Sequence, residues 1–113
     1  MISHEHLEEL NKQCAGEAKE YFEQQIQYVL LPSLRLPPGC TPNPVNALLC
    51  LGARDNYPTR LFFEKQISGK SGLNWNSSNV VILESNWFAY SWKDVTNDGR
   101  PLEVLLNHLK ALA

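Results

Sequence analysis

Two β-prone runs in the middle of the chain constrain its fold more than any other feature. Residues 45–53 and 59–67 are rich in apolar side chains, and the turn-prone residues 54–58 separate them. Two such runs joined by a short turn are typical of an antiparallel β-hairpin. Strand-like segments at residues 80–83 and 87–92 continue the pattern. The sequence therefore predicts an antiparallel meander of about four strands.

Amphipathic segments flank this meander. Near the N-terminus, apolar side chains recur at spacings of three and four after Ser3, a residue suited to capping a helix. We expect this first helix to run from about residue 3 to residue 25. The last segment opens with Pro101, which suits the first helical position. Its leucines share one face: Leu102, Leu105, Leu106, Leu109 and Leu112.

The stretch before the hairpin is interrupted by prolines. Residues 26–36 are apolar and partly β-prone, but they contain Pro32 and are followed by Pro37-Pro38-Gly39. Proline cannot donate to a β-ladder, so this stretch is predicted to supply only a short edge strand. The order of helix, meander and helix predicts a single α+β domain over residues 1–113, with both helices mainly on one face of the sheet.

Composition limits the classes of partner. Twelve acidic and ten basic side chains give a net charge of −2, which is too little positive charge for nucleic-acid binding. The longest apolar stretches fall far short of the ~20 residues of a membrane helix. The N-terminus lacks the basic and apolar regions of a secretion signal, and three cysteines without a Cys-x-x-Cys pair suit a reducing compartment. We therefore expect a cytoplasmic protein with no nucleic-acid or membrane partner.

A metal or cofactor site has no support in the sequence. The three histidines, His4, His6 and His108, lie at the two ends of the chain, and the cysteines lack the spacing of zinc ligands. His108 is offset from the leucine stripe of the last helix, so we expect it to face solvent or to lie at the core boundary. No metal and no cofactor are expected.

Aromatic residues gather late in the chain. Strand alternation from residue 87 places Trp87 on one face and Tyr90 and Trp92 on the other. Two interpretations remain open: these side chains line the core and shield a sheet edge, or some of them form an exposed patch that receives a partner. Under the second interpretation, the candidate partner-binding residues are Tyr57, Trp87, Tyr90 and Trp92.

Short motifs connect the chain to a known family. They are Leu36-Pro37-Pro38-Gly39 before the first hairpin, Tyr57-Pro58 inside it, Trp87 with Ser91-Trp92, and Arg100-Pro101-Leu102. Together with the order of elements, they resemble the bacterial ubiquitin-conjugating-enzyme-like proteins, in particular the divergent group called family E. The resemblance covers about residues 26–113. It implies a truncated conjugating-enzyme fold that works beside an activating enzyme, a ubiquitin-like protein and a deconjugating metalloprotease.

The chain departs from this family where the chemistry occurs. A working conjugating enzyme needs a cysteine after the meander to form a thioester, and a His-Pro-Asn whose asparagine stabilises the oxyanion. This sequence has no His-Pro-Asn, and its last cysteine is Cys50. Cys14 and Cys50 fall in apolar patterns and are interpreted as small buried side chains. Cys40 lies in a proline-rich loop, is expected to be the most exposed, and is the one weak thiol candidate.

Two functions of different classes follow from the sequence. The first is a divergent conjugating-enzyme-like component of a bacterial ubiquitin-like pathway, which binds its partners without a standard catalytic cysteine. The alternative is a stand-alone protein-interaction or oligomerisation domain, for which a homo-oligomer is possible. A small-molecule enzyme or binder would need a deep pocket with convergent polar groups, which a sequence alone does not reveal.

Overall fold

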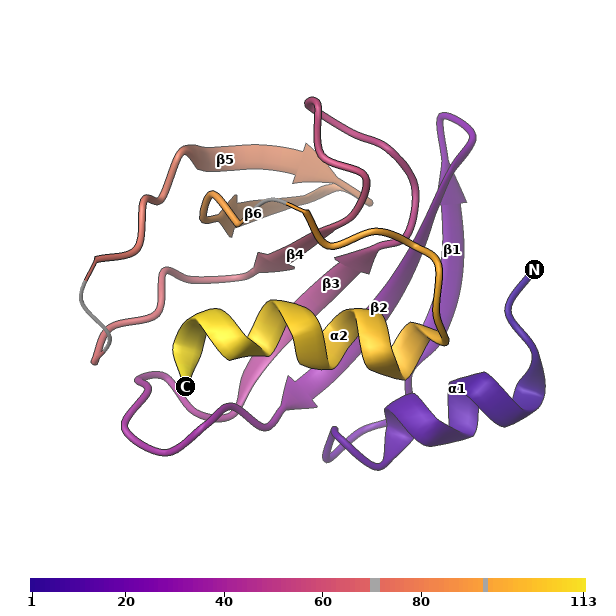
Figure 1. Ribbon diagram of the computed structural model, residues 1–113, viewed down its shortest axis with the longest axis horizontal. Coiled ribbons are helices and arrows are strands. Elements are labelled where there is room, and N and C mark those ends of the chain that lie inside the picture. The colour runs from indigo at the N-terminus through magenta and orange to yellow at the C-terminus, as the bar shows by residue number, and fades with distance from the viewer. Residues whose placement is uncertain (70–71, 93) are drawn as a thin grey trace.

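A run of strands lies between two helices along the described chain. The structure, a computed structural model, describes residues 1–69, 72–92 and 94–113. The helices are α1 (His4–Asn11) and α2 (Pro101–Leu109), which continues into a 3₁₀ turn, η1 (Lys110–Leu112). The strands are β1 (Lys19–Glu23), β2 (Ile26–Leu34), β3 (Val45–Cys50), β4 (Arg60–Phe63), β5 (Ser77–Ile82) and β6 (Ser85–Ala89). They pair antiparallel in the order β1-β2-β3-β4-β6-β5 (Figure 1). The predicted α+β class is confirmed.

The number of strands exceeds the prediction. The described residues form six strands, whereas the sequence predicted about four. The hairpin of β3 and β4 lies where it was predicted, although both strands are shorter than the apolar runs. β5 and β6 overlap the predicted segments at residues 80–83 and 87–92. The predicted meander is wrong at this point, because β6 and not β5 pairs with β4. The two additional strands, β1 and β2, come from residues assigned to the first helix and to a short edge strand.

The predicted helix over residues 3–25 is correct only in its first part. Ser3 caps α1 as expected, because its hydroxyl accepts a main-chain N–H of the first turn at 3.1 Å. The helix then ends at Asn11, and Cys14 lies in an isolated β-bridge with Leu34 rather than on a helix. The apolar spacing beyond Asn11 therefore does not mark a helical face. Cys14 and Ala18 are buried separately, and Tyr21 and Phe22 are exposed on β1.

A tight turn explains why the following residues form a hairpin. Gln24 and Gln25 have φ angles of 51° and 67°, the left-handed conformation found in two-residue hairpin turns. Such a turn matches the right-handed twist of its flanking strands, so β1 folds back onto β2 with Glu23 opposite Ile26. A helix through these residues is incompatible with two consecutive left-handed positions.

β2 is a nine-residue strand inside the sheet, not the short edge strand predicted from its proline. The register between β2 and β3 shifts between Leu31 and Leu34, and Ser33 within this bulge has a φ of 52°. Pro32 therefore occupies a place where the ladder is already interrupted, so its missing N–H costs no hydrogen bond.

Side chains are buried on both faces of the sheet. The helical core, between sheet and helices, includes Leu10, Val29, Leu31, Leu49, Leu61, Phe63, Tyr90 and Leu105. The concave core, on the opposite face, consists of Tyr28, Leu48, Cys50, Phe62, Ile82, Trp87 and Ala89. Burial of each large apolar side chain contributes roughly 1.5–3 kcal/mol, so both faces stabilise the fold.

The sheet curls toward its concave core and forms a half-barrel. Ile82 on β5 joins Tyr28 on β2 in that core, although three strands separate β5 from β2 in the sheet. At the strand ends, the main-chain N–H of Leu83 donates to a carboxylate oxygen of Glu23 at 3.1 Å. The two edges of the sheet therefore approach each other at one end.

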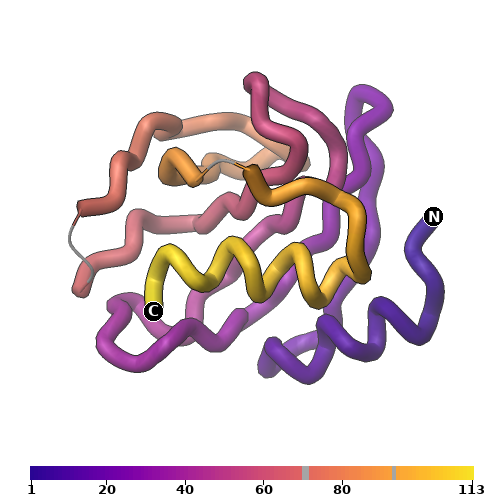
Figure 2. The backbone as a smooth tube through the Cα atoms, viewed as in Figure 1, coloured from indigo at the N-terminus to yellow at the C-terminus, as the bar shows by residue number. Residues whose placement is uncertain are grey.

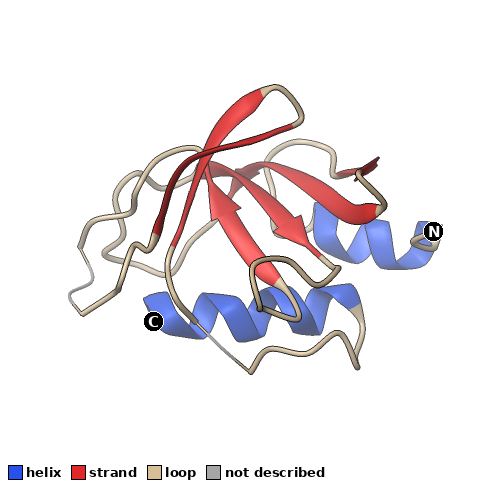
Figure 3. Cartoon of the chain, turned by 90° about the horizontal axis from the view of Figure 1, so that it is seen from above, coloured by secondary structure: helices blue, strands red, loops and turns tan. Residues whose placement is uncertain are grey.

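Both helices lie on the face opposite the concave core, as predicted (Figure 3). Arg100, directly before α2, forms an ion pair with Glu9 of α1 and so links the two helices. The backbone trace shows the C-terminus at the end of α2 and the N-terminus near the opposite end of that helix (Figure 2). Within the described residues, neither helix has the length and apolar character needed to span a bilayer.

Candidate functional site

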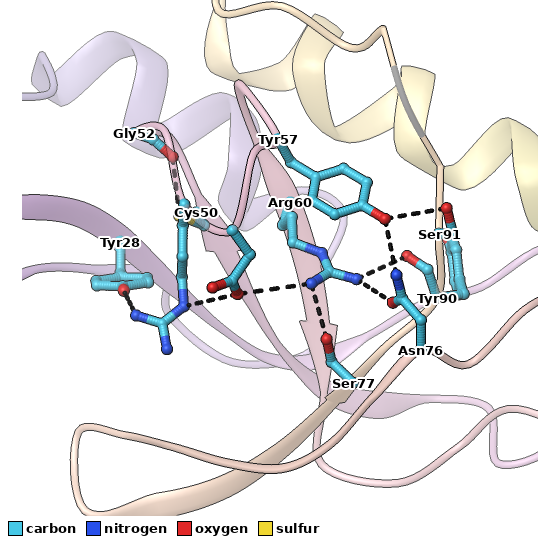
Figure 4. A network of polar contacts seen from close by, with 11 residues as sticks. Tyr28, Cys50, Gly52, Tyr57, Arg60, Asn76, Ser77, Tyr90 and Ser91 are labelled. Carbon is cyan, nitrogen blue, oxygen red and sulfur yellow. Dashed lines mark hydrogen bonds and ion pairs between the residues drawn. The ribbon is translucent and has the colours of Figure 1, made fainter.

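A buried arginine organises the polar side chains at one end of the half-barrel. Arg60 begins β4, and only 2% of its surface is exposed. Its Nη2 donates to Asn76 Oδ1 at 2.6 Å and to the main-chain oxygen of Tyr90 at 3.2 Å, and its Nη1 donates to Ser77 Oγ at 2.9 Å. The Arg60 network is the set of residues Tyr28, Arg54, Asp55, Tyr57, Arg60, Asn76, Ser77, Tyr90 and Ser91 (Figure 4).

Aromatic rings cover the guanidinium. Its central carbon lies 4.1 Å from the ring centroid of Tyr57 and 5.5 Å from that of Phe62, within range of a cation–π interaction. The Tyr57 hydroxyl donates to Ser91 Oγ at 3.0 Å and accepts a hydrogen bond from Asn76 Nδ2 at 2.8 Å. The groups that hold Arg60 are therefore themselves held in place.

A two-residue turn brings a carboxylate beside Arg60. Asp55 and Asn56 have φ angles of 54° and 70°, and the main chains of Arg54 and Tyr57 exchange two hydrogen bonds of 2.9 Å across them. Asp55 Oδ2 consequently lies 3.4 Å from Arg54 Nε and 3.7 Å from Arg60 Nη1. The carboxylate faces both guanidinium groups while its side chain remains 51% exposed.

The chemistry of this network is structural. Burial lowers the pKa of Arg60, and the neighbouring Tyr57 and Asp55 oppose that shift. The guanidinium stays charged at neutral pH because its unperturbed pKa is so high. Its hydrogen bonds join β4 to the start of β5 and to the segment after β6. Among the described residues of the network, no group is placed as a nucleophile with an adjacent base.

All three thiols are buried. Exposure is 0% for Cys50, 5% for Cys14 and 7% for Cys40. Cys40 is the most exposed of the three, as expected, but it is buried and not accessible in its loop. Its thiol donates to the main-chain oxygen of Leu112 at 3.7 Å, because η1 packs over the proline-rich loop. Burial raises the pKa of Cys14 to about 11 and is also the main cause of the raised pKa of Cys50. Burial disfavours the thiolate that a nucleophile must provide.

His108 is buried, which corrects the expectation of a solvent-facing or boundary residue. It is 2% exposed, and its Nε2 lies 2.8 Å from Thr59 Oγ1. The Thr59 hydroxyl donates to the main-chain oxygen of Val95 at 2.6 Å, so the imidazole must donate through Nε2. Burial, followed by the charge of Arg60, lowers the pKa of His108 to about 4. The pair is inaccessible because Thr59 is 1% exposed.

The aromatic candidates divide by burial. Trp87 lies in the concave core and Tyr90 in the helical core, as strand alternation predicted. Tyr57 is also buried, over Arg60. Trp92 is 38% exposed and is therefore the predicted partner-binding residue that a protein could reach without unfolding the sheet.

Trp92 and Leu106 are two exposed apolar side chains at α2. Leu106 is 43% exposed, and the Trp92 Nε1 donates to the main-chain oxygen of the next residue, Asn107, at 3.1 Å. Leu106 also borders an open cleft of about 390 Å³. This cleft is lined by Gln13, Arg35, Leu36, Pro37, Leu106, Leu109, Lys110 and Ala113. We call Trp92, Leu106 and this cleft the α2 surface.

A second cleft, of about 250 Å³, lies at the end of the concave core remote from Arg60. It is lined by Leu30, Pro32, Asn46, Glu64, Ser85, Asn86 and Trp87. Within the described part of the chain, no group of three His, Cys, Asp or Glu residues is arranged to hold a metal ion.

Comparisons with known protein families, curated proteins and solved structures found no match to this chain. Its function must therefore be argued from the geometry. Sequence analysis missed the Arg60 network entirely. The available signal was a charged residue, Arg60, at the start of an apolar strand with Asp55 in the preceding turn.

Proposed function

We propose that this chain is a conjugating-enzyme-like domain that binds partner proteins of a bacterial ubiquitin-like pathway without a catalytic cysteine, in the cytoplasm. The order of α1, an antiparallel sheet and α2 supports the proposal. So do the positions of Leu36-Pro37-Pro38-Gly39 before β3 and of Tyr57-Pro58 before β4. The three cysteines are free thiols, as in proteins of a reducing compartment.

The exposure of Trp92, whose indole N–H is bonded to α2, is the observation that carries the binding role. Tryptophan is enriched among the residues that dominate the binding energy of protein interfaces. The indole N–H of Trp92 already donates to Asn107, so a partner can cover the ring without leaving a donor unsatisfied. The cleft beside Leu106 offers a partner further contact area on α2.

Burial of the thiols supports the non-catalytic part of the proposal. A thioester-forming cysteine must be reachable by the flexible tail of the ubiquitin-like protein and must attack as a thiolate. We expect no thiol-sensitive adduct when the chain is mixed with its cognate activating enzyme, ubiquitin-like protein and ATP. An adduct that disappears with reducing agent and with Cys40→Ser would overturn this part.

Titration calorimetry with the cognate activating enzyme and ubiquitin-like protein tests the binding role. Trp92→Ala should weaken binding at least ~30-fold, because a tryptophan anchor is worth about 2 kcal/mol or more, while the melting temperature changes little. Val81→Ala is the matched control, since Val81 is 64% exposed on β5, away from α2. Equal affinities of both variants and the wild-type chain would refute the assignment of the α2 surface.

A stand-alone interaction or oligomerisation domain is the second candidate function. The edge strand β1 favours it, because Tyr21 and Phe22 are 37% and 57% exposed there. Neighbouring genes separate the two candidates. Adjacent genes for an activating enzyme and a ubiquitin-like protein support the first, and their absence supports the second.

A further inference from the structure

β1 is an edge of the sheet that is suited to pairing with another strand. It lies at one end of the sheet order, so β2 is its one neighbour among the described strands. Its five residues pair with β2 in unbroken register. The other edge, β5, is less regular, since its register shifts between Ser77 and Val80. A regular edge with exposed aromatic side chains is a template for strand addition.

The hairpin turn determines which main-chain groups of β1 point outward. In a two-residue hairpin the closing pair, here Glu23 and Ile26, exchanges hydrogen bonds, and hydrogen-bonded pairs then alternate along the strands. The main-chain groups of Glu23, Tyr21 and Lys19 therefore face β2. Those of Glu20 and Phe22 face away from the sheet and are available to an added strand.

We propose that β1 pairs antiparallel with β1 of a second copy of this chain, centred on Tyr21, and forms a symmetric dimer with a continuous sheet. In this register Glu20 of each copy lies opposite Phe22 of the other copy. Their outward main-chain groups then exchange four hydrogen bonds around the twofold axis. The proposal concerns a different surface from α2 and does not depend on the role proposed for that surface.

Charge complementarity identifies the second copy as the occupant. The sequence of β1 is Lys-Glu-Tyr-Phe-Glu, so pairing centred on Tyr21 places Lys19 opposite Glu23 of the second copy, twice by symmetry. These are non-hydrogen-bonded pairs, in which side chains come closest and opposite charges attract. Within the described residues, neither Lys19 nor Glu23 forms an ion pair in the monomer. Tyr21 meets its own counterpart on the axis.

The environment of these side chains permits the contact. Lys19 is exposed, and Glu23 is half-buried because one of its carboxylate oxygens accepts the N–H of Leu83. A carboxylate can accept several hydrogen bonds, so the Leu83 contact is compatible with an additional ammonium group. Two five-residue strands make a small interface, which places the dimer in the weak, transient class.

Sedimentation velocity of the full chain over a dilution series up to about 1 mM tests the dimer, because weak interfaces have dissociation constants in the micromolar range or above. We expect a reversible monomer–dimer equilibrium. Lys19→Glu and Glu23→Lys should each weaken it ~10-fold or more, since each puts like charges opposite each other twice. A wild-type chain that stays monomeric at every concentration would overturn the proposal.

Mixing the two variants separates the ion pairs from any folding defect. The Lys19→Glu variant carries acidic side chains at both residues 19 and 23, and the Glu23→Lys variant carries basic side chains at both. A heterodimer of the two variants therefore restores both opposite-charge pairs. We expect the equimolar mixture to dimerise more tightly than either variant alone. Lys65→Glu, an exposed charge change after β4, is the matched control and should dimerise like the wild-type chain. If the mixture stays monomeric, the register centred on Tyr21 is wrong.

Discussion

Unfolding should cost progressively less free energy as the pH falls from about 6.5 to about 4, because of His108. Burial and Arg60 hold the pKa of folded His108 at about 4, against 6.5 for an ordinary histidine. Between these values the unfolded chain binds a proton at this residue and the folded chain does not, so acid favours the unfolded state. One pKa unit is worth about 1.4 kcal/mol, which makes the full loss about 3 kcal/mol.

Urea unfolding followed by tryptophan fluorescence, repeated from about pH 7.5 to about pH 4, measures this loss. His108→Gln removes the titration and keeps a side-chain N–H that can donate to Thr59. Across the same range its unfolding free energy should fall by about 3 kcal/mol less than that of the wild-type chain. His4→Gln, at a side chain that is 88% exposed, is the control and should follow the wild-type curve. If the unfolding free energies of His108→Gln and the wild-type chain fall equally with pH, the folded protein does not hold His108 neutral.

Two further predictions concern stability. Arg60→Met should lower the unfolding free energy by about 3 kcal/mol, because three hydrogen bonds of the guanidinium are lost, one of them to the buried main-chain oxygen of Tyr90; an unchanged melting temperature would contradict this. Gly69→Ala should cost more than Gly39→Ala in thermal unfolding. Both glycines have positive φ angles, 95° and 94°, but a Cβ at Gly69 would collide with the main-chain oxygen of Gly39, whereas a Cβ at Gly39 meets nothing within 4 Å. Equal losses of thermal stability in the two variants would show that the Cβ at residue 69 meets no such collision.

Local patterns predicted the parts of the fold that local forces determine. Pro101 and the leucine stripe correctly predicted α2, and the apolar runs around residues 54–58 correctly predicted the hairpin of β3 and β4. The first helix was overextended because Cys14 and Ala18 continue a helical spacing, yet they are buried through separate contacts. The left-handed turn at residues 24–25 was not recognised, because glutamine is an uncommon residue for it.

Errors at the site have a different cause, which is the packing of distant segments. Cys40 lies in a loop, but η1 covers it from the other end of the chain. His108 is offset from the leucine stripe, but Thr59 and Val95 approach that side of α2 as well. Arg60 gathers acceptors from residues 16 to 30 positions away. Local sequence patterns do not indicate contacts between segments that are far apart in the chain. The buried polar groups were therefore the least predictable part of the molecule.

The joint between β4 and β6 gives the fold an internal weak point. The sheet is continuous there through a single paired position, Phe63 opposite Phe88. The β5–β6 hairpin is therefore retained mainly by its side chains in the concave core and by the bonds that Arg60 makes to Asn76 and Ser77. Sub-global opening at this joint can release the hairpin while β1–β4 keep their ladder, at a lower cost than complete unfolding. Native-state amide exchange would then detect two cooperative units, which the hydrogen bonds of Arg60 hold together.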